Sequence, residues 1–165
     1  MKNLVLFAIC AFYYGSLSAQ IKPSIEPAYK RVPTIPPFNI ILAQDSSIFT
    51  KENLRKKKPV IIIVFSPDCD HCVHATENLI SNIKSFKNTE IILASSLSYE
   101  SVRKFYKDLN LKEYPNIHVG YDSKRFLGSF YQIHSFPSIF LYNKKGNFKM
   151  DFSDQPNFKI IASSL

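Results

Sequence analysis

The sequence predicts a single α/β domain with a central mixed β-sheet flanked by helices. A length of 165 residues leaves room for one domain, and 45% apolar with 14% aromatic residues is enough for one hydrophobic core. Short β-branched runs alternate with helical patterns and end in a hairpin, an order typical of this fold class. With 4 Gly, 10 Pro and no repeated block, collagen-like, solenoid and low-complexity chains are excluded.

Residues 1–19 have the layout of a secretory signal peptide. Lys2 supplies a positive start, residues 4–14 are uncharged and mostly apolar, and small residues follow at 15–20. The apolar stretch is too short to span a bilayer comfortably. We therefore expect cleavage immediately before or after Ala19 and export to the periplasm. The alternative is an uncleaved leader that anchors the protein in the membrane.

Residues 20–37 contain five prolines and no apolar periodicity, which predicts an extended arm between the membrane side and the domain at 38–165. The domain opens with a strand-like run at 38–43. A short polar helix is expected at 50–58, where Thr50 is a suitable N-cap residue.

The run Val-Ile-Ile-Ile-Val-Phe at 60–65 has no polar residue, which is typical of a central strand buried on both faces. A helix is expected from Cys72, because apolar residues from Val73 to Phe86 follow one helical stripe. A second buried strand follows at 90–95.

The rest of the chain continues the alternation of helices and strands. In order, we expect an amphipathic helix at 99–111, a short strand at 117–119, a short helix at 123–132, a third buried strand at 138–142, a turn at 143–146 and an antiparallel edge strand at 147–152. The last segment, 157–165, is shorter than a usual closing helix.

The chain is basic, with 21 Lys and Arg against 13 Asp and Glu, a net charge of +8. Loss of Lys2 with the leader lowers this to 8 − 1 = +7. The basic residues are scattered, and the one run, at 55–58, is closed by Pro59 and is interpreted as a solvated turn. The sequence therefore does not predict a nucleic-acid partner.

The cysteines indicate redox chemistry. The chain has 3 Cys, and removal of the leader leaves only Cys69 and Cys72. A bridge between them closes too small a loop to stabilise the fold much, so the pair is interpreted as a redox pair or as half of a metal site. A lipid on Cys10 is an alternative fate for the leader, although the residues before it are a poor lipidation signal.

The order of strand, the segment Phe-Ser-Pro-Asp-Cys-Asp-His-Cys at 65–72, and helix resembles the thioredoxin superfamily. Phe136-Pro137 directly precedes the third buried strand, as the cis-proline does in that family, and Lys145-Gly146 follows in the hairpin turn. The resemblance covers 38–152. Because 137 − 72 = 65 residues separate Cys72 from Pro137, the chain looks like the secreted TlpA-like, redoxin-type branch, which inserts extra structure before the proline.

The resemblance implies a role for each residue of the motif. Cys69 is the exposed nucleophile at a helix N-terminus, and Cys72 is the thiol that resolves the mixed disulfide. Asp70 and His71 modulate the redox potential in opposite directions. Phe136 and Pro137 are expected to bind the strand of an incoming partner. A redox-active Cys69–Cys72 disulfide is the only expected cofactor, and no metal is expected.

The motif also departs from the family pattern. Ile63 stands where thioredoxin has a buried acid, and Asp68 replaces the aromatic residue before the first cysteine. Ala75 stands where TlpA-like relatives often carry an acid, and Glu77 is the nearest acid on the expected helix. The proton carrier for the resolving thiol is therefore unassigned.

These features predict a monomeric extracytoplasmic thiol–disulfide oxidoreductase that acts on protein thiols or disulfides, close to the membrane, with an upstream redox partner. The direction of electron flow stays open. One alternative is a copper or zinc module, in which His71, His74 or His134 completes the ligand set of the cysteines. The other is a thioredoxin-fold binding protein without turnover. A peroxidase is disfavoured because the Thr-x-x-Cys environment of peroxiredoxins is absent.

Overall fold

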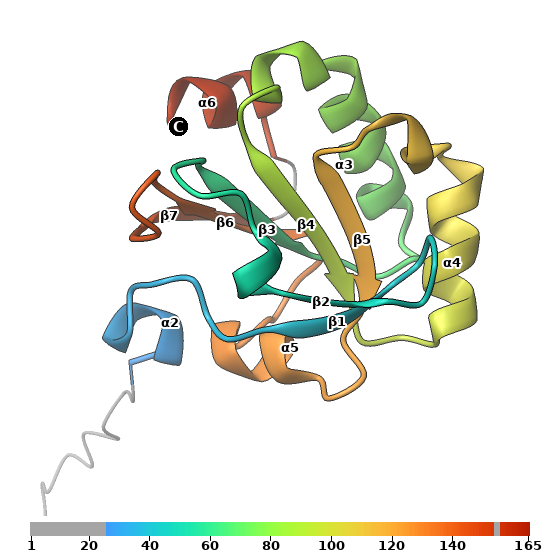
Figure 1. Cartoon of the computed structure of the whole chain (residues 1–165), viewed down its shortest axis with the longest axis horizontal. Helices are drawn as coiled ribbons and strands as arrows, with labels where there is room; N and C mark the ends of the chain where they lie inside the picture. The colour runs from blue at the N-terminus through green and yellow to red at the C-terminus, as the bar shows by residue number, and fades with distance from the viewer. Residues whose placement is uncertain (1–25, 154–155) are drawn as a thin grey trace, which may run out of the picture.

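The computed structural model describes residues 26–153 and 156–165 (Figure 1). The leader predicted at 1–19, with Cys10, and the start of the arm lie outside the described residues. Within the described residues, none of the helices combines the length and the apolar character needed to cross a bilayer.

A single mixed sheet of seven strands organises the domain, in the order β2-β1-β5-β4-β3-β6-β7. The strands are β1 (Asn39–Leu42), β2 (Ile48–Thr50), β3 (Val60–Val64), β4 (Glu90–Ser95), β5 (Ile117–Tyr121), β6 (Ser138–Tyr142) and β7 (Phe148–Ser153). β3, β4 and β5 run parallel, whereas β1, β2, β6 and β7 pair with their neighbours in the antiparallel sense. The predicted fold class is confirmed.

Helices cover both faces of the sheet (Figure 1). They are α2 (Ala28–Arg31), α3 (Asp70–Ser81), α4 (Tyr99–Asp108), α5 (Phe126–Tyr131) and α6 (Phe158–Ser163), with 3-10 turns η1 (Lys51–Asn53), η2 (Ile83–Phe86) and η3 (Leu111–Glu113). Helices α3, α4 and α6 contribute to one hydrophobic core, and α2 and α5 to a second core on the other face. The short α6 still closes its end of the sheet, because Phe158 and Ile161 are fully buried.

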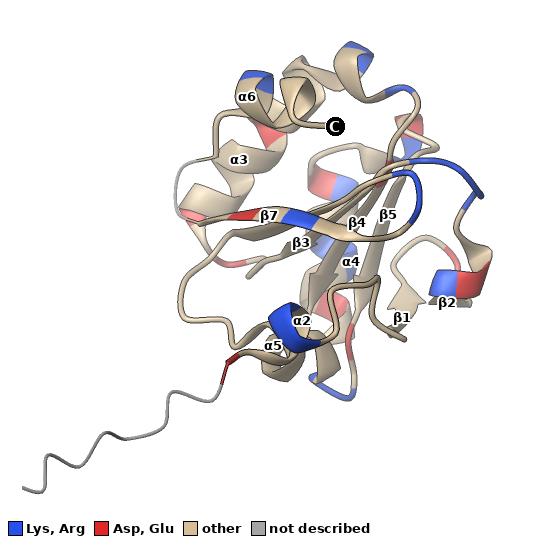
Figure 2. Cartoon of the chain, turned by 90° about the vertical axis from the view of Figure 1, so that its left-hand side faces the viewer, with Lys and Arg blue, Asp and Glu red and all other residues tan. Residues whose placement is uncertain are grey.

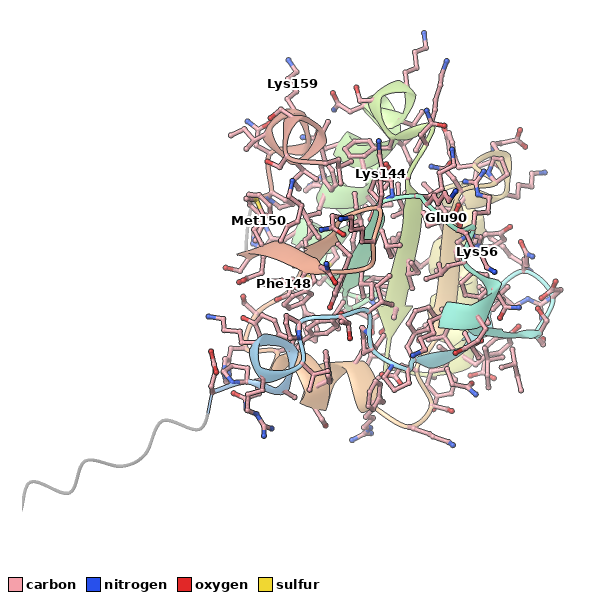
Figure 3. All side chains as sticks on the ribbon, turned by 60° about the vertical axis from the view of Figure 1, so that its left-hand side comes forward. Lys56, Glu90, Lys144, Phe148, Met150 and Lys159 are labelled. Atoms are coloured by element: carbon pink, nitrogen blue, oxygen red, sulfur yellow. The ribbon has the colours of Figure 1, made fainter. Side chains whose placement is uncertain are left out.

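Strand β3 divides its side chains between the two cores. Ile61 and Ile63 face the core beneath α3, whereas Ile62 and Val64 face the core beneath α5. All five residues of the strand are buried, as the uninterrupted apolar run predicted. In β7 a bulge interrupts this alternation: Phe148 pairs with Tyr142 and packs toward α2, whereas Met150 pairs with Leu141 and points toward the side of α6 (Figure 3).

The prediction of a polar helix at 50–58 is wrong. Its first residue ends strand β2, which pairs with β1, and only Lys51–Asn53 form a single 3-10 turn. The backbone N–H of Thr50 donates to Asn53 Oδ1 at 2.8 Å, so the capping signal is real but caps one turn. A polar segment without an apolar stripe has little to gain from extending a helix, since packing supplies most helical stability.

The arm predicted at 20–37 is not an extended tether over its described part. Residues 28–31 form α2, and Tyr29 is 6% exposed in the core beneath α5. Beyond it, the Phe148 N–H donates to Pro33 O at 2.8 Å, and the Ile35 N–H donates to Gly146 O at 3.0 Å. The second half of the arm is therefore part of the packed domain.

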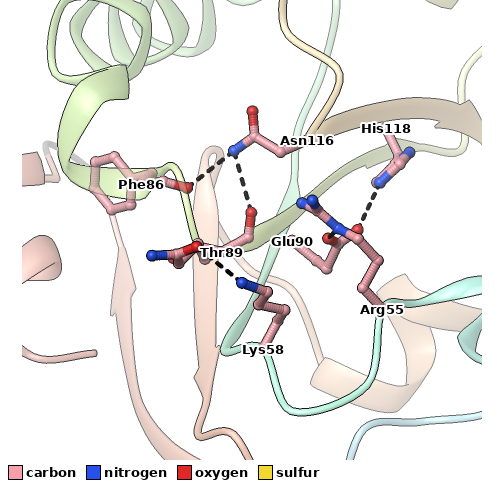
Figure 4. A network of polar contacts seen from close by, with 8 residues as sticks. Arg55, Lys58, Phe86, Thr89, Glu90, Asn116 and His118 are labelled. Carbon is pink, nitrogen blue, oxygen red and sulfur yellow. Dashed lines mark hydrogen bonds and ion pairs between the residues drawn. The ribbon is translucent and has the colours of Figure 1, made fainter.

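A buried carboxylate ties three segments together at the end of the sheet where β3, β4 and β5 begin (Figure 4). Glu90, the first residue of β4, is 1% exposed and accepts hydrogen bonds from Arg55 and from His118 Nε2, the latter at 2.9 Å. Burial alone would raise the pKa of Glu90, but the bonds and charges of His118 and Arg55 outweigh it and lower that pKa. His118 also stacks on Phe49, so it is a structural residue of this end of the sheet.

We expect Glu90→Gln to lower the free energy of unfolding at neutral pH by about 2 kcal/mol, because the amide leaves buried donors poorly satisfied. The folded pKa is depressed, so this contribution is present above the ordinary glutamate pKa of 4.5 and is lost as the pH falls through the folded value. Urea unfolding at a series of pH values measures both effects. The exposed Glu113→Gln is the control. The expectation is contradicted if the wild-type protein and Glu90→Gln have equal free energies of unfolding at neutral pH, or if the difference between them persists in acid.

Candidate active site

The two cysteines lie where the chain leaves the central strand and enters α3. Cys69 is the N-cap residue of α3, with extended backbone angles (φ −104°, ψ 116°). Its N–H donates to Ser66 O at 3.2 Å, and its carbonyl accepts from the N–H groups of Cys72 at 2.9 Å and Val73 at 3.1 Å. The helix begins two residues earlier than the sequence pattern predicted, so Cys69 lies at the end where the helix macrodipole favours negative charge.

The two thiols differ sharply in their access to solvent. Cys69 is partly exposed, whereas Cys72 is 1% exposed in the core beneath α3. Burial raises the pKa of Cys72 to about 12, the neighbouring Cys69 thiol adds to the shift, and a backbone hydrogen bond from Ser66 partly opposes it. Both thiols are unpaired. One sulfur can therefore meet a protein partner, while the other is shielded and protonated at neutral pH.

Strand register brings Phe136-Pro137 to the same edge of the sheet as the cysteines. Val64, the last residue of β3, pairs with Ser138, the first residue of the antiparallel β6. The segment that follows β3 and the one that precedes β6 are therefore neighbours. The Phe136–Pro137 bond is cis, as expected from the resemblance.

Exposed apolar side chains flank the cysteines at this edge. Phe136 is 41% exposed on the β6 side, and Leu97, which follows β4, is also 41% exposed. Strand β4 is parallel to β3, so its end lies at the same edge. Scattered exposed apolar residues are ordinary, but two beside a reactive thiol supply contact area for a polypeptide.

The predicted modulating residues, Asp70 and His71, lie in the first turn of α3 with exposed side chains. Among the described residues, neither side chain makes a hydrogen bond or an ion pair. His74 is also exposed, and its Nδ1 lies 3.1 Å from Glu77 Oε2. Any effect of Asp70 and His71 on the thiols is therefore carried by charge through solvent rather than by a fixed contact.

No carboxylate stands at the positions where relatives of this fold carry one. Ile63 is buried in β3, and Ala75 is buried on the inner face of α3. Glu77 is exposed and directed to His74, so it does not supply the missing proton carrier. A contact that the sequence did not suggest is the bond from Thr76 Oγ1 to the carbonyl of Cys72, at 2.8 Å, which satisfies the buried hydroxyl of Thr76 within α3.

The described residues contain no group of three or more His, Cys, Asp or Glu side chains arranged to hold a metal ion. In particular, His134 lies in the segment before Pro137 with an exposed side chain, and His74 is directed to Glu77. The alternative of a copper or zinc module therefore gains no support from the geometry.

Charge is distributed unevenly along the strands. The basic run at 55–58 precedes β3, Lys87 precedes β4, and Lys144 and Lys145 form the β6–β7 hairpin, all at the end of the sheet opposite the cysteines (Figures 2 and 3). Acidic Asp68 and Asp70 flank Cys69 instead. The residues next to Cys69 in the sequence are therefore acidic, although the chain as a whole is basic.

No family model and no curated protein matches the chain. Solved structures that share its fold include a protein described as a thioredoxin from Neisseria meningitidis (23% identity, TM-score 0.63, 78% of this chain and 84% of that one), a secreted Mycobacterium tuberculosis disulfide oxidoreductase (14%, 0.64, 78% and 93%) and a thiol peroxidase from Chromobacterium violaceum (16%, 0.64, 79% and 82%). At these identities the likeness establishes the fold. The chain has a thioredoxin-like fold, as the sequence resemblance implied, and β4, α4, β5 and α5 occupy the long separation between α3 and Pro137.

Proposed function

We propose that the protein is an extracytoplasmic thiol–disulfide oxidoreductase that exchanges disulfides with partner proteins through Cys69-Asp70-His71-Cys72. The observation that carries the proposal is the division between a partly exposed Cys69 at the N-cap of α3 and a buried Cys72 one turn inside. Disulfide oxidoreductases among the solved structures of the same fold support it.

In the reducing direction, the Cys69 thiolate attacks one sulfur of a partner disulfide. A Cys69–partner bond forms, the partner S–S bond breaks, and the second partner sulfur leaves as a thiolate that takes up a proton. The apolar edge formed by Phe136 and Leu97 holds the partner chain over Cys69.

Cys72 then loses its proton and attacks the Cys69 sulfur, which releases the first partner sulfur as a thiol. The product is a Cys69–Cys72 disulfide, and two electrons have passed to the partner. The reverse sequence oxidises a partner dithiol, and an upstream redox partner resets the pair in either direction. Because the pKa of Cys72 is about 12, its deprotonation is the demanding step of resolution in the reducing direction.

Export is the second part of the proposal. The layout of residues 1–19 supports a secretory leader that delivers the domain to the periplasm, with a membrane-anchored form as the alternative. Mass spectrometry of the protein from its own cells should find a mature N-terminus at residue 19 or 20. Detection of residues 2–15 in the mature protein contradicts cleavage.

Single cysteine variants test the exchange reaction. Cys72→Ser removes the resolving thiol, so mixed disulfides through Cys69 should accumulate at about tenfold or more above the level in Cys69→Ser. Non-reducing electrophoresis followed by mass spectrometry of the bands measures both. Equal trapping by the two variants would show that the nucleophile is misassigned. No trapping by either, in the presence and absence of a chelator, would overturn the oxidoreductase proposal.

A further inference from the structure

Beside Pro137 lies a pocket of about 190 Å³ that thiol–disulfide exchange does not use. Its floor is the buried surface of Tyr131, Ser138 and Phe140, and Tyr29 of α2 forms one wall. The segment 132–135 and the last residues of β7, Asp151–Ser153, form its rim. Ser135 and Ser138 flank Phe136-Pro137, so the pocket adjoins the edge of the sheet that carries Cys69.

Asp151 is the acidic group of this pocket. It pairs across the strands with Phe140, so both side chains lie on the face covered by α2 and α5. The ring of Tyr29 packs against Phe140 at a centroid distance of 5.2 Å, which brings the tyrosine beside Asp151. Burial raises the pKa of Tyr29, and the nearby carboxylate of Asp151 raises it further.

The carboxylate of Asp151 makes the rim suited to a cation. Within the part of the chain that the structure describes, Asp151 makes no ion pair. Gln132 and Ser153 can each accept or donate, and His134 also lines the rim. Ser138 already donates to Ser135 O at 2.7 Å, so Asp151 is the one carboxylate among the described residues that line the pocket. Ammonium and guanidinium groups carry donors only, so a Lys or Arg side chain matches the Asp151 carboxylate, and the apolar floor covers its aliphatic stem.

We propose that this pocket binds a Lys or Arg side chain of the partner polypeptide, close in its sequence to the reactive cysteine, with Asp151 as the counter-ion. This inference rests on the proposed function, because it names the partner segment that the redox site selects. The packed arm takes part directly: without Tyr29 the pocket loses the wall that faces Asp151.

The test uses peptides whose single cysteine forms a mixed disulfide with a chromophoric aromatic thiol. In each peptide, one residue two to five positions from that cysteine is Lys, norleucine or Glu. Attack by Cys69 releases the peptide thiol or the coloured thiol, and mass spectrometry with absorbance follows both products. At one spacing, the Lys peptide should react about tenfold faster than the Glu peptide at low salt, and the preference should shrink as salt screens the pair.

Asp151→Asn should reduce this preference to within about twofold, and Asp151→Lys should reverse it in favour of the Glu peptide. Asp108→Asn, which removes an exposed acid on α4, is the matched control and should keep the wild-type preference. The rate with hydroxyethyl disulfide, which has no charge, should stay unchanged in all three variants.

A normal rate with hydroxyethyl disulfide but no preference for Lys at any spacing overturns the pocket assignment and leaves the proposed function standing. A Lys preference that survives both Asp151 substitutions overturns it as well. If neither peptides nor hydroxyethyl disulfide react with the wild-type protein, the proposed function fails, and the inference fails with it.

Discussion

Strand β3 is the constraint on which the site depends. It is buried on both faces, and it pairs with β4 in the parallel sense and with β6 in the antiparallel sense. A strand held on both sides cannot slip by one residue, because a slip would turn every side chain toward the wrong core. Its last residue therefore fixes where Cys69 emerges, and the antiparallel register with β6 places Pro137 beside it.

The same constraint explains the difference between the two thiols. The loop from β3 ends at the N-cap of α3, and the next turn of the helix lies over the sheet, where Cys72 loses its contact with water. No acid stands at Ile63 or Ala75 to take the proton of Cys72, so burial dominates its pKa. Attack by the partly exposed Cys69 does not require a buried proton acceptor. Resolution by Cys72 does, so it depends on a proton acceptor supplied by the partner or by solvent.

Local patterns predicted the features that depend on burial and periodicity. The run at 60–65 predicted a strand covered on both faces, and the apolar stripe after Cys72 predicted α3 to within two residues of its start. Features set by distant contacts were missed. Residues 48–50 joined the sheet as β2 because β1 offered a free edge, and the arm packed because Tyr29 met aromatic rings from α5, β6 and β7. Neither Arg55 nor Asp151 carried a local signal, since their partners lie far along the chain.

The division between the thiols is tested most directly by alkylation of the folded protein with iodoacetamide over a pH series, with each cysteine followed by mass spectrometry. The exposure of the two residues and the Cys72 pKa of about 12 predict that Cys69 is modified near neutral pH, while Cys72 is protected until strongly alkaline conditions or unfolding. Unfolding in urea should make the two rates equal. Equal rates in the folded protein, or faster modification of Cys72, would contradict the account.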